Sequence, residues 1–356
     1  MGRSLEETIS AIKPMDETSM HAAQARQDEL TKPIGSLGRM EEISIQIAGI
    51  TGNPRPKIKD KAIIVMAADH GVVASGVSLY PQEVTAQMMH GFLAGTAGIN
   101  VLSRHIDARV VAVDMGVIGG FEPQPNLICK MIDFGTKDMT QGPAMTRQQA
   151  IDAIESGIDV VEAEIAKGLD IVGTGDMGIG NTTPSTAICA AITGKPVAQV
   201  TGRGAGLGDE QLADKVEMIE KALEINKPDP KDAIDVLAKV GGFEIGGLAG
   251  VILGAAANRI PVVIDGFISG AAALIAATLC PQSTAYMIAG HQSVEIGHRA
   301  MYEHMKLEPV LNLNMRLGEG TGGALAMSIA EASCKILDEM FTFAEAEVSG
   351  ADKEVQ

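Results

Sequence analysis

Short apolar runs, each followed by a turn that contains glycine or aspartate, recur through the middle of the chain. They lie at Ala62–Ala67, Arg109–Val113, Leu169–Val172 and Pro261–Ile264. The runs are continuous and rich in β-branched residues, whereas a strand with one exposed face would alternate apolar and polar residues. This pattern predicts strands that are buried on both faces of a parallel sheet.

Helical spacing fills the intervals between these strands. Thr146–Gln149 has the form of a capping box, and isoleucine or valine then recurs every three or four residues up to Ile165. A second amphipathic helix begins at Asp209, and apolar helices flank the strand that ends at Ile264. Strands that alternate with helices predict an α/β fold with an open, doubly wound, mainly parallel sheet of the Rossmann-like type.

The two ends of the chain differ from its middle, because they carry helical patterns without strands. Helices are expected at Met15–Leu30, at about Met40–Ile50 and at Gly323–Phe341, and the last of these can pack against the first two. We therefore expect two domains: a small helical domain from residues 1–58 and 325–350, and a large α/β catalytic domain from residues 59–324.

The net charge of the chain limits the classes of partner that it can bind. A formal net charge of −17 argues against nucleic acid and anionic membranes, because both would repel such a surface. The longest weakly charged stretch, Glu244–Glu295, is interrupted by Pro261 and by Asp265-Gly266, so its pieces are too short to span a bilayer. The four cysteines form no CxxC pair and the first residues are polar. We therefore expect free thiols in a cytoplasmic protein that acts on small molecules.

Glycine-rich segments are candidates for loops that approach a ligand closely. They lie at Gly173–Thr183, Thr201–Gly208 and Gly318–Gly323. The first and third match GxGxxG, which makes a dinucleotide-binding dehydrogenase the main alternative. That fingerprint also requires an acidic residue about twenty positions on, for the ribose hydroxyls. No Asp or Glu occurs between Met177 and Gly208, so the dehydrogenase is disfavoured.

Both GxGxxG matches instead carry an acidic residue inside the motif, Asp176 and Glu319. Carboxylates in such loops can accept a proton from a nitrogen base or stabilise a cationic sugar. The alternative is that they cap a helix or brace a loop. The sequence has no HExxH pattern, no Cys/His cluster and no GxSxG elbow. We therefore expect no metal site and no cofactor.

Seven segments in one order carry a family resemblance: TKPIGSLGR at 31–39, AADHGVVASG at 67–76, VSLYPQEVTAQ at 77–87, GDMGIGNTT at 175–183, TGRGAG at 201–206, HQSVEIGH at 291–298 and RLGEGTGG at 316–323. Together they are far more specific than any one glycine pattern. Over nearly its whole length the chain resembles the nicotinate-nucleotide–dimethylbenzimidazole phosphoribosyltransferases.

This resemblance implies an enzyme that moves the 5-phosphoribosyl group of nicotinate mononucleotide to 5,6-dimethylbenzimidazole or a related base. The transfer inverts C1′ and gives α-ribazole 5′-phosphate and nicotinate, in the assembly of cobalamin-type cofactors. The resemblance also implies a homodimer without a metal. Two alternatives stay open at this point: a paralogue that acts on phenolic or other bases, and a non-catalytic nucleotide-binding protein.

Roles for individual residues also follow from the resemblance. Glu319 matches the family's general base, and Asp176 stands where the family has a second acidic residue, often Glu. Tyr80 and Gln87 match the wall of the aromatic-base pocket. Familiar members have a small polar residue in place of Tyr80, so the native base is left open. The other matched substrate-binding residues are Gly178, Gly204, Lys215, Asp265, Ser293, Arg316 and Leu317.

Within that set we expect separate roles for the phosphate and the sugar. The 5′-phosphate is expected near the N-terminus of a helix, among backbone amides around Gly178 and with Lys215 and Ser293 close by. Asp265 is expected to orient the ribose. An acidic protein can hold one phosphate in this way, because the phosphate needs only local donors.

Overall fold

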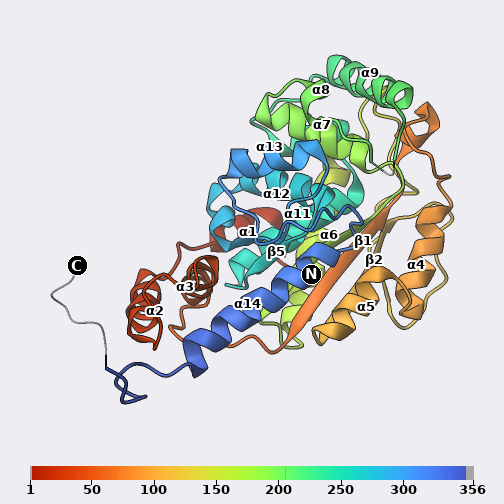
Figure 1. Cartoon of the computed structure of the whole chain (residues 1–356). Helices are drawn as coiled ribbons and strands as arrows, with labels where there is room; N and C mark the ends of the chain where they lie inside the picture. Colours follow the sequence, from red (N-terminus) through yellow and green to blue (C-terminus); the bar gives the residue numbers. More distant parts are fainter. Residues whose placement is uncertain (1, 205, 350–356) are drawn as a thin grey trace.

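The fold is an open, fully parallel α/β sheet with helices on both faces. The computed structural model describes residues 2–204 and 206–349, and within these residues six strands form one sheet in the order β3-β2-β1-β4-β5-β6 (Figure 1). The strands are β1 Lys61–Ala68, β2 Ala108–Gly116, β3 Leu127–Cys129, β4 Ile171–Met177, β5 Val262–Ile264 and β6 Met287–Ala289. Every neighbouring pair is parallel. The predicted doubly wound, Rossmann-like sheet is therefore confirmed.

The predicted strands at Ala62–Ala67, Arg109–Val113 and Pro261–Ile264 are confirmed as β1, β2 and β5. The sequence analysis did not predict the short strands β3 and β6. The equally short β5 was predicted because its apolar run is followed by the Asp265-Gly266 turn.

The prediction for the fourth strand was wrong at its end. The run Leu169–Val172 was expected to lead into a glycine loop, but β4 continues through Gly173 and Gly175 to Met177. Each glycine makes room for a close approach from another segment. A Cβ at residue 173 would lie 2.4 Å from Ile63 Cδ1, and one at residue 175 would lie 2.4 Å from the Glu319 carbonyl oxygen. These glycines therefore serve packing within a strand rather than a phosphate-binding turn.

The helices occupy the intervals between strands and both ends of the chain. Their bounds are α1 Leu5–Ala11, α2 Glu17–Glu29, α3 Arg39–Thr51, α4 Val84–Ala94, α5 Gly98–His105, α6 Arg147–Ile165, α7 Thr182–Thr193, α8 Val197–Val200, α9 Asp209–Asn226, α10 Ala233–Val240, α11 Phe243–Ala257, α12 Phe267–Leu279, α13 Ile296–Met305 and α14 Thr321–Glu339. Short 3₁₀ turns lie at Gly71–Ser75 and Pro281–Tyr286. The predicted capping box at the start of α6 is confirmed, since Thr146 and Gln149 exchange hydrogen bonds.

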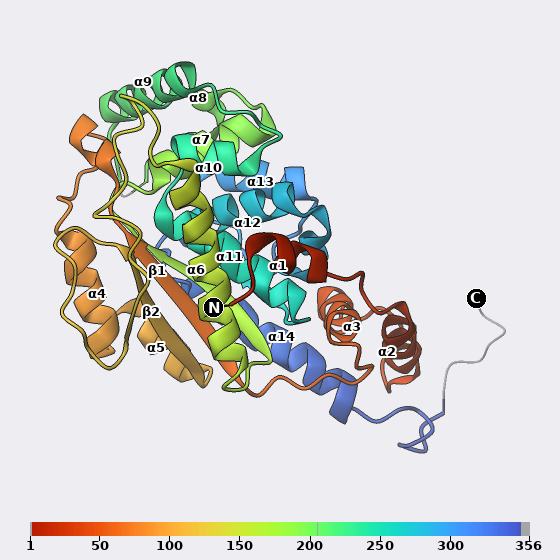
Figure 2. The same ribbon diagram turned by 180° about the vertical axis from the view of Figure 1, so that it is seen from behind.

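Alternate residues of β1 belong to two different cores. Ile64 and Met66 pack with α6, α11 and α12, whereas Ile63 and Val65 pack with α4, α5 and α14. Figure 1 shows α14 in front of the sheet, and the opposite view in Figure 2 shows α6 on the near side. Burial on both faces explains why the strands read as continuous apolar runs.

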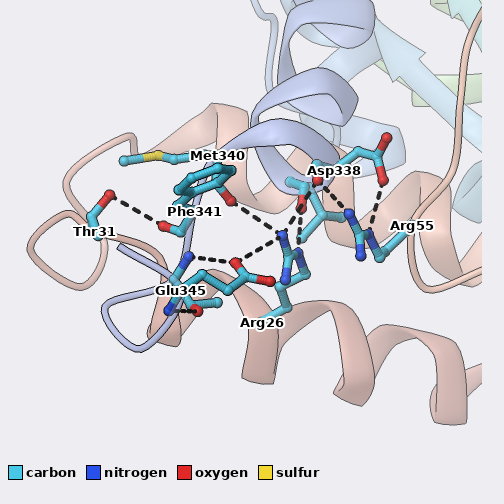
Figure 3. A network of polar contacts seen from close by, with 9 residues as sticks. Arg26, Thr31, Arg55, Asp338, Met340, Phe341 and Glu345 are labelled. Carbon is cyan, nitrogen blue, oxygen red and sulfur yellow. Dashed lines mark hydrogen bonds and ion pairs between the residues drawn. The ribbon is translucent and has the colours of Figure 1, made fainter. Parts of the chain in front are cut away.

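A small helical cluster joins the two ends of the chain. Ala23 of α2, Ala48 of α3 and Leu337 of α14 form a separate core. Arg26 donates to the carbonyl oxygens of Leu337 (2.7 Å) and Met340 (3.1 Å), which satisfies acceptors at the end of α14 (Figure 3). In this way the predicted contact between the last helix and the N-terminal helices is confirmed.

The division into two domains stays a prediction, because helices of the predicted small domain also pack against the predicted large domain. The first half of α14 packs on β4 and β5, and α1 packs on α6 and α11 rather than on the small cluster. Residues 1 and 350, at the expected limits of the small domain, lie outside the described residues.

Two further expectations concern chemistry rather than shape. All four cysteines are free thiols, and Cys129 is the exposed one. Among the described helices, none is both long and apolar enough to cross a membrane.

Candidate functional site

A cavity opens at the carboxyl ends of the strands, at the point between β1 and β4 where the strand order reverses. Open α/β sheets bind ligands at this point, because the loops after the two strands diverge there. The cavity encloses about 920 Å³ when its open mouth is included. Its walls come from six segments: residues 77–79, residues 176–182, Arg203 with Gly204 and Leu207, residues 266–268, His291 with Ser293 and Glu295, and residues 316–318.

One end of the cavity is formed by the start of α7. The segment Gly178–Thr182 joins β4 to this helix and lines the cavity, so the first N–H groups of α7, which lack acceptors inside the helix, lie at this end. The N–H of Ile179 in this segment donates to Thr85 Oγ1 at 3.1 Å. Lys215 of α9 is 1% exposed, and its Nζ donates to Thr182 Oγ1 at 2.7 Å. A Cβ on Gly204 would lie 3.5 Å from the same Nζ. Burial lowers the pKa of Lys215 to about 8, so its charge is sensitive to an anion placed beside it.

Further charged groups surround this end. Arg203 and Arg316 line the cavity, and Arg316 Nη1 donates to the Gly204 carbonyl oxygen at 3.3 Å. Glu295 also lines it. Burial raises the pKa of Glu295, while the nearby Lys215 ammonium lowers it. A cationic end with one buried carboxylate can hold a phosphate and discriminate its charge state.

Asp176 lies at the end of β4 and lines the cavity while remaining buried. Asn181 Nδ2 donates to its Oδ2 at 3.0 Å, and Oδ1 has no hydrogen-bond partner among the described residues. Burial is the main cause that raises the pKa of Asp176 well above its ordinary value, and the negative charges of Asp265, Glu244 and Glu319 add to it. An unpartnered, buried carboxyl oxygen at a cavity wall is suited to contact a bound ligand.

Glu319 lies behind the cavity wall rather than in it. Its neighbours Leu317 and Gly318 line the cavity, but Glu319 does not, and it is 5% exposed. Its Oε2 accepts a hydrogen bond from the backbone N–H of Ile99 at 2.9 Å. Burial raises its pKa, the N–H of Ile99 lowers it, and the charge of Asp265 raises it again. The carboxylate therefore caps the start of α5, which is one of the two roles left open by the sequence.

Asp265 is fully buried beneath the Glu319 loop. Its Oδ1 accepts from the N–H of Gly323 at 2.8 Å, and its Oδ2 accepts from the N–H of Gly320 at 3.2 Å. His291 Nε2 lies 3.6 Å from Oδ1. The side chain thus braces the start of α14 and does not line the cavity, so its expected role towards the ribose stays a prediction.

Tyr80 and Gln87 both lie outside the cavity lining. Tyr80 is 51% exposed and Gln87 is on the exposed side of α4. The preceding residues Val77, Ser78 and Leu79 do line the cavity, so the segment reaches the site although Tyr80 itself is not part of the lining.

The structure thus brings together about half of the predicted site. Six predicted residues line the cavity: Asp176, Gly178, Gly204, Ser293, Arg316 and Leu317. The lining residues that were not predicted as substrate-binding include Thr182, Arg203, His291 and Glu295. All four stand inside segments that carry the resemblance, GDMGIGNTT, TGRGAG and HQSVEIGH, so the sequence marked the segment without marking the side chain. Among the described residues, no group of three or more His, Cys, Asp or Glu side chains is placed to hold a metal ion.

The cationic end and acidic wall of this cavity are compatible with a phosphorylated sugar as ligand. The chain matches the phosphoribosyltransferase family over residues 12–348, and it belongs to that family. Relatives named nicotinate-nucleotide–dimethylbenzimidazole phosphoribosyltransferase include one from Roseiflexus sp. (strain RS-1), 62% identical over 97% of this chain and 98% of the relative. Another, from Chloroflexus aurantiacus, is 60% identical over the same shares of both chains.

Solved structures lead to the same family. A crystal structure of CobT from Thermus thermophilus is similar with a TM-score of 0.91 and 42% identity, covering 94% of this chain and 100% of that one. A second structure, of nicotinate-nucleotide–dimethylbenzimidazole phosphoribosyltransferase from the same organism, has a TM-score of 0.90 and 41% identity, covering 95% and 100%. The chain is therefore a transferase enzyme, and the purely nucleotide-binding alternative is disfavoured.

Proposed function

We propose that this protein transfers the 5-phosphoribosyl group of nicotinate mononucleotide to 5,6-dimethylbenzimidazole, giving α-ribazole 5′-phosphate and nicotinate. The observation that carries the proposal is the identity of about 60% to enzymes of that name along 97% of the chain. The cavity at the switch point supports it, because a cationic end and an acidic wall suit a phosphorylated sugar attached to a nitrogen base.

In this proposal the nucleotide lies along the cavity with its phosphate at the start of α7. Backbone N–H groups around Gly178 and the ammonium of Lys215 hold the phosphate, and Ser293, Gly204 and Arg316 surround it. The phosphate is remote from C1′, so its binding energy positions the sugar for attack. The ribose then lies beside Asp176, and the incoming base lies towards Leu317, with Tyr80 and Gln87 at the pocket's outer edge.

The reaction breaks the C1′–N bond of the nicotinate ring, whose nitrogen keeps the electron pair and leaves neutral. No general acid is needed, because the leaving ring was a cationic pyridinium. A benzimidazole nitrogen forms the new bond at the opposite face of C1′, which inverts that carbon. The proton on its other nitrogen passes to the carboxylate of Glu319. Burial raises the pKa of Glu319, which makes it a stronger base near neutral pH.

Asp176 is proposed as the second acidic group of the reaction. Its Oδ1 lacks a partner among the described residues and the side chain reaches the cavity. Because its pKa is raised well above the ordinary value, it stays protonated to a higher pH than a carboxyl group in solvent, and it can donate a hydrogen bond to the sugar.

We further propose that the enzyme is a cytoplasmic homodimer that needs no cofactor and in which residues 1–58 and 325–350 form a small helical domain. The free cysteines support the compartment. Light scattering coupled to size exclusion tests the assembly, and a mass of twice 37.0 kDa is expected.

A competition assay tests the proposed substrate. The purified protein is incubated with nicotinate mononucleotide and an equimolar mixture of 5,6-dimethylbenzimidazole, benzimidazole, adenine and p-cresol, and the ribotides are separated and identified by mass spectrometry. Benzimidazole ribotides are expected to dominate. A dominant cresol product would favour the phenolic paralogue, and nucleotide binding without any ribotide would favour the binding protein.

A further inference from the structure

The start of α5 has an unusual capping arrangement. Its N-cap residue is Ala97, whose side chain cannot accept a hydrogen bond, although the first N–H groups of a helix need acceptors. The acceptor comes from a distant part of the chain: the Ile99 N–H donates to Glu319 Oε2 at 2.9 Å across 220 residues. The proposed base is therefore attached to the first turn of a helix that does not itself line the cavity.

Gly98 makes this contact possible. A Cβ on Gly98 would lie 3.2 Å from Glu319 Oε2 and 2.9 Å from Leu317 Cδ2. The backbone of Gly98 is helical and its φ is not positive, so alanine could adopt it without backbone strain. What an added methyl group would disturb is the approach of the Glu319 loop.

The main chain around Glu319 is fixed independently of this contact. Gly318, Glu319 and Gly320 have φ values of +79°, +62° and +95°, a run of left-handed conformations in which Glu319 is the residue with a side chain. Thr321 Oγ1 donates to the Gly318 carbonyl oxygen at 2.8 Å, and Asp265 holds the N–H of Gly320. With the backbone held, the α5 contact decides where the carboxylate points.

The acidic side chains near Glu319 oppose ionisation of its carboxyl group, whereas the N–H groups at the start of α5 favour it. Asp265 and Asp176 are the acidic neighbours, on the β5 and β4 sides of the loop. The N–H groups of Ile99 and Gly98 act in the other direction and favour the carboxylate. Among the described residues, no hydrogen bond reaches Glu319 Oε1, so one oxygen is held and the other is left to accept a proton.

We propose that the first turn of α5 positions the catalytic carboxylate of Glu319, and that Gly98 and the Ile99 N–H are the positioning groups. The hydrogen bond holds Oε2, leaves Oε1 for the base, and keeps the carboxylate ionised among its acidic neighbours. This inference rests on the proposed role of Glu319 as the base.

Gly98→Ala tests the proposal, with Gly91→Ala as the matched control. A Cβ on Gly91, in α4, would have its nearest neighbour at 3.8 Å, so the control adds the same methyl group without a clash. Gly98→Ala is expected to lower kcat by about 10²-fold, because misplacing a catalytic group by about 1 Å costs that much. KM for nicotinate mononucleotide should change little. Gly91→Ala should match the wild type in both.

The pH profile separates positioning from mere helix capping. Loss of an N–H donor raises the pKa of a carboxylate, so the acidic limb of the kcat profile should move to higher pH in Gly98→Ala. If Gly98→Ala folds poorly, an ester in place of the Ile99 amide removes the N–H and adds no atoms, and the same shift is expected. A purely structural role would lower the melting temperature and leave the limb in place.

Two outcomes are distinguishable. Wild-type kcat and an unshifted acidic limb in both the Gly98→Ala and the ester variants would overturn this inference and leave the proposed transferase activity intact. Failure of the wild-type protein to form any ribotide would instead overturn the proposed function itself.

Discussion

We expect replacement of Lys215 by methionine to remove the pH dependence of stability that this residue confers and to weaken binding of the nucleotide. Burial lowers the pKa of this side chain from 10.5 to about 8, and the Glu295 carboxylate raises it in part. The unfolded chain keeps the ordinary value. Between pH 8 and 10.5 the unfolded chain therefore binds a proton at this site that the folded chain has lost. The stability of the ligand-free wild type consequently rises with pH in this window. Below pH 8 the folded protein bears the whole cost of burying the charged side chain.

The magnitude follows from the two pKa values. One pKa unit corresponds to about 1.4 kcal/mol, so burial of Lys215 costs about 3 kcal/mol at pH 8 and about 1 kcal/mol at pH 10. Relative to Lys215→Met, the wild type should gain about 2 kcal/mol between these pH values. The slope is the quantity to compare, because loss of Lys215 leaves Glu295 without its partner and shifts the absolute stability of the variant.

Urea unfolding at pH 8, 9 and 10 and one protein concentration measures this slope. Lys221→Met, on the exposed side of the same helix, is the control and should follow the wild type. Saturating nicotinate mononucleotide should abolish the difference, because its phosphate keeps Lys215 charged, and Lys215→Met should raise KM for the nucleotide more than for the base. Parallel wild-type and Lys215→Met curves without nucleotide would show that the pKa of Lys215 is not lowered by burial.

Three other substitutions test separate parts of the site. Glu319→Gln keeps the shape but cannot take the proton, so kcat should fall about 10²–10⁴-fold with a smaller change in KM. Tyr80→Ser removes a large flat surface and should change the ratios of kcat/KM among substituted benzimidazoles. Asp265→Asn sets an amide donor against the N–H groups at the start of α14, and the free energy of unfolding should fall by about 1–3 kcal/mol.

Each of these has a contradicting outcome. A folded Glu319→Gln enzyme with near wild-type turnover would remove Glu319 from the mechanism and turn attention to Asp176. Unchanged base preferences would show that Tyr80 does not select the base. Undiminished stability of Asp265→Asn in urea would contradict its bracing of the Glu319 loop.

The architecture was predictable where local pattern and burial agree. β1 is buried along its whole length, so its apolar run was visible without any tertiary information. The prediction failed in β4, where Gly173 and Gly175 interrupt the run. Gly173 and Gly175 make room for Ile63 and for the Glu319 loop, about 110 and 144 residues away in sequence. The sequence near each glycine does not show such distant contacts.

The site was predictable as a set of segments and less so as a set of side chains. The glycine-rich loops at strand ends contribute to the cavity wall, and two residues that the resemblance supplied, Asp176 and Ser293, line the cavity. No spacing could show that Glu319 is tied to Ile99 or that Asp265 turns inward to the start of α14. Those facts depend on how α5 and α14 pack against one face of the sheet.

The stereochemistry of the transfer distinguishes the proposed reaction from hydrolysis and from a transfer with retention. Nicotinate mononucleotide and 5,6-dimethylbenzimidazole are incubated with the enzyme, nicotinate is quantified, and the anomeric proton of the ribotide is assigned by NMR. We expect one nicotinate released per ribotide formed, no release without the benzimidazole, and an α linkage at C1′. Release of nicotinate without an added base, or a ribotide that retains the β linkage, would contradict the proposed reaction.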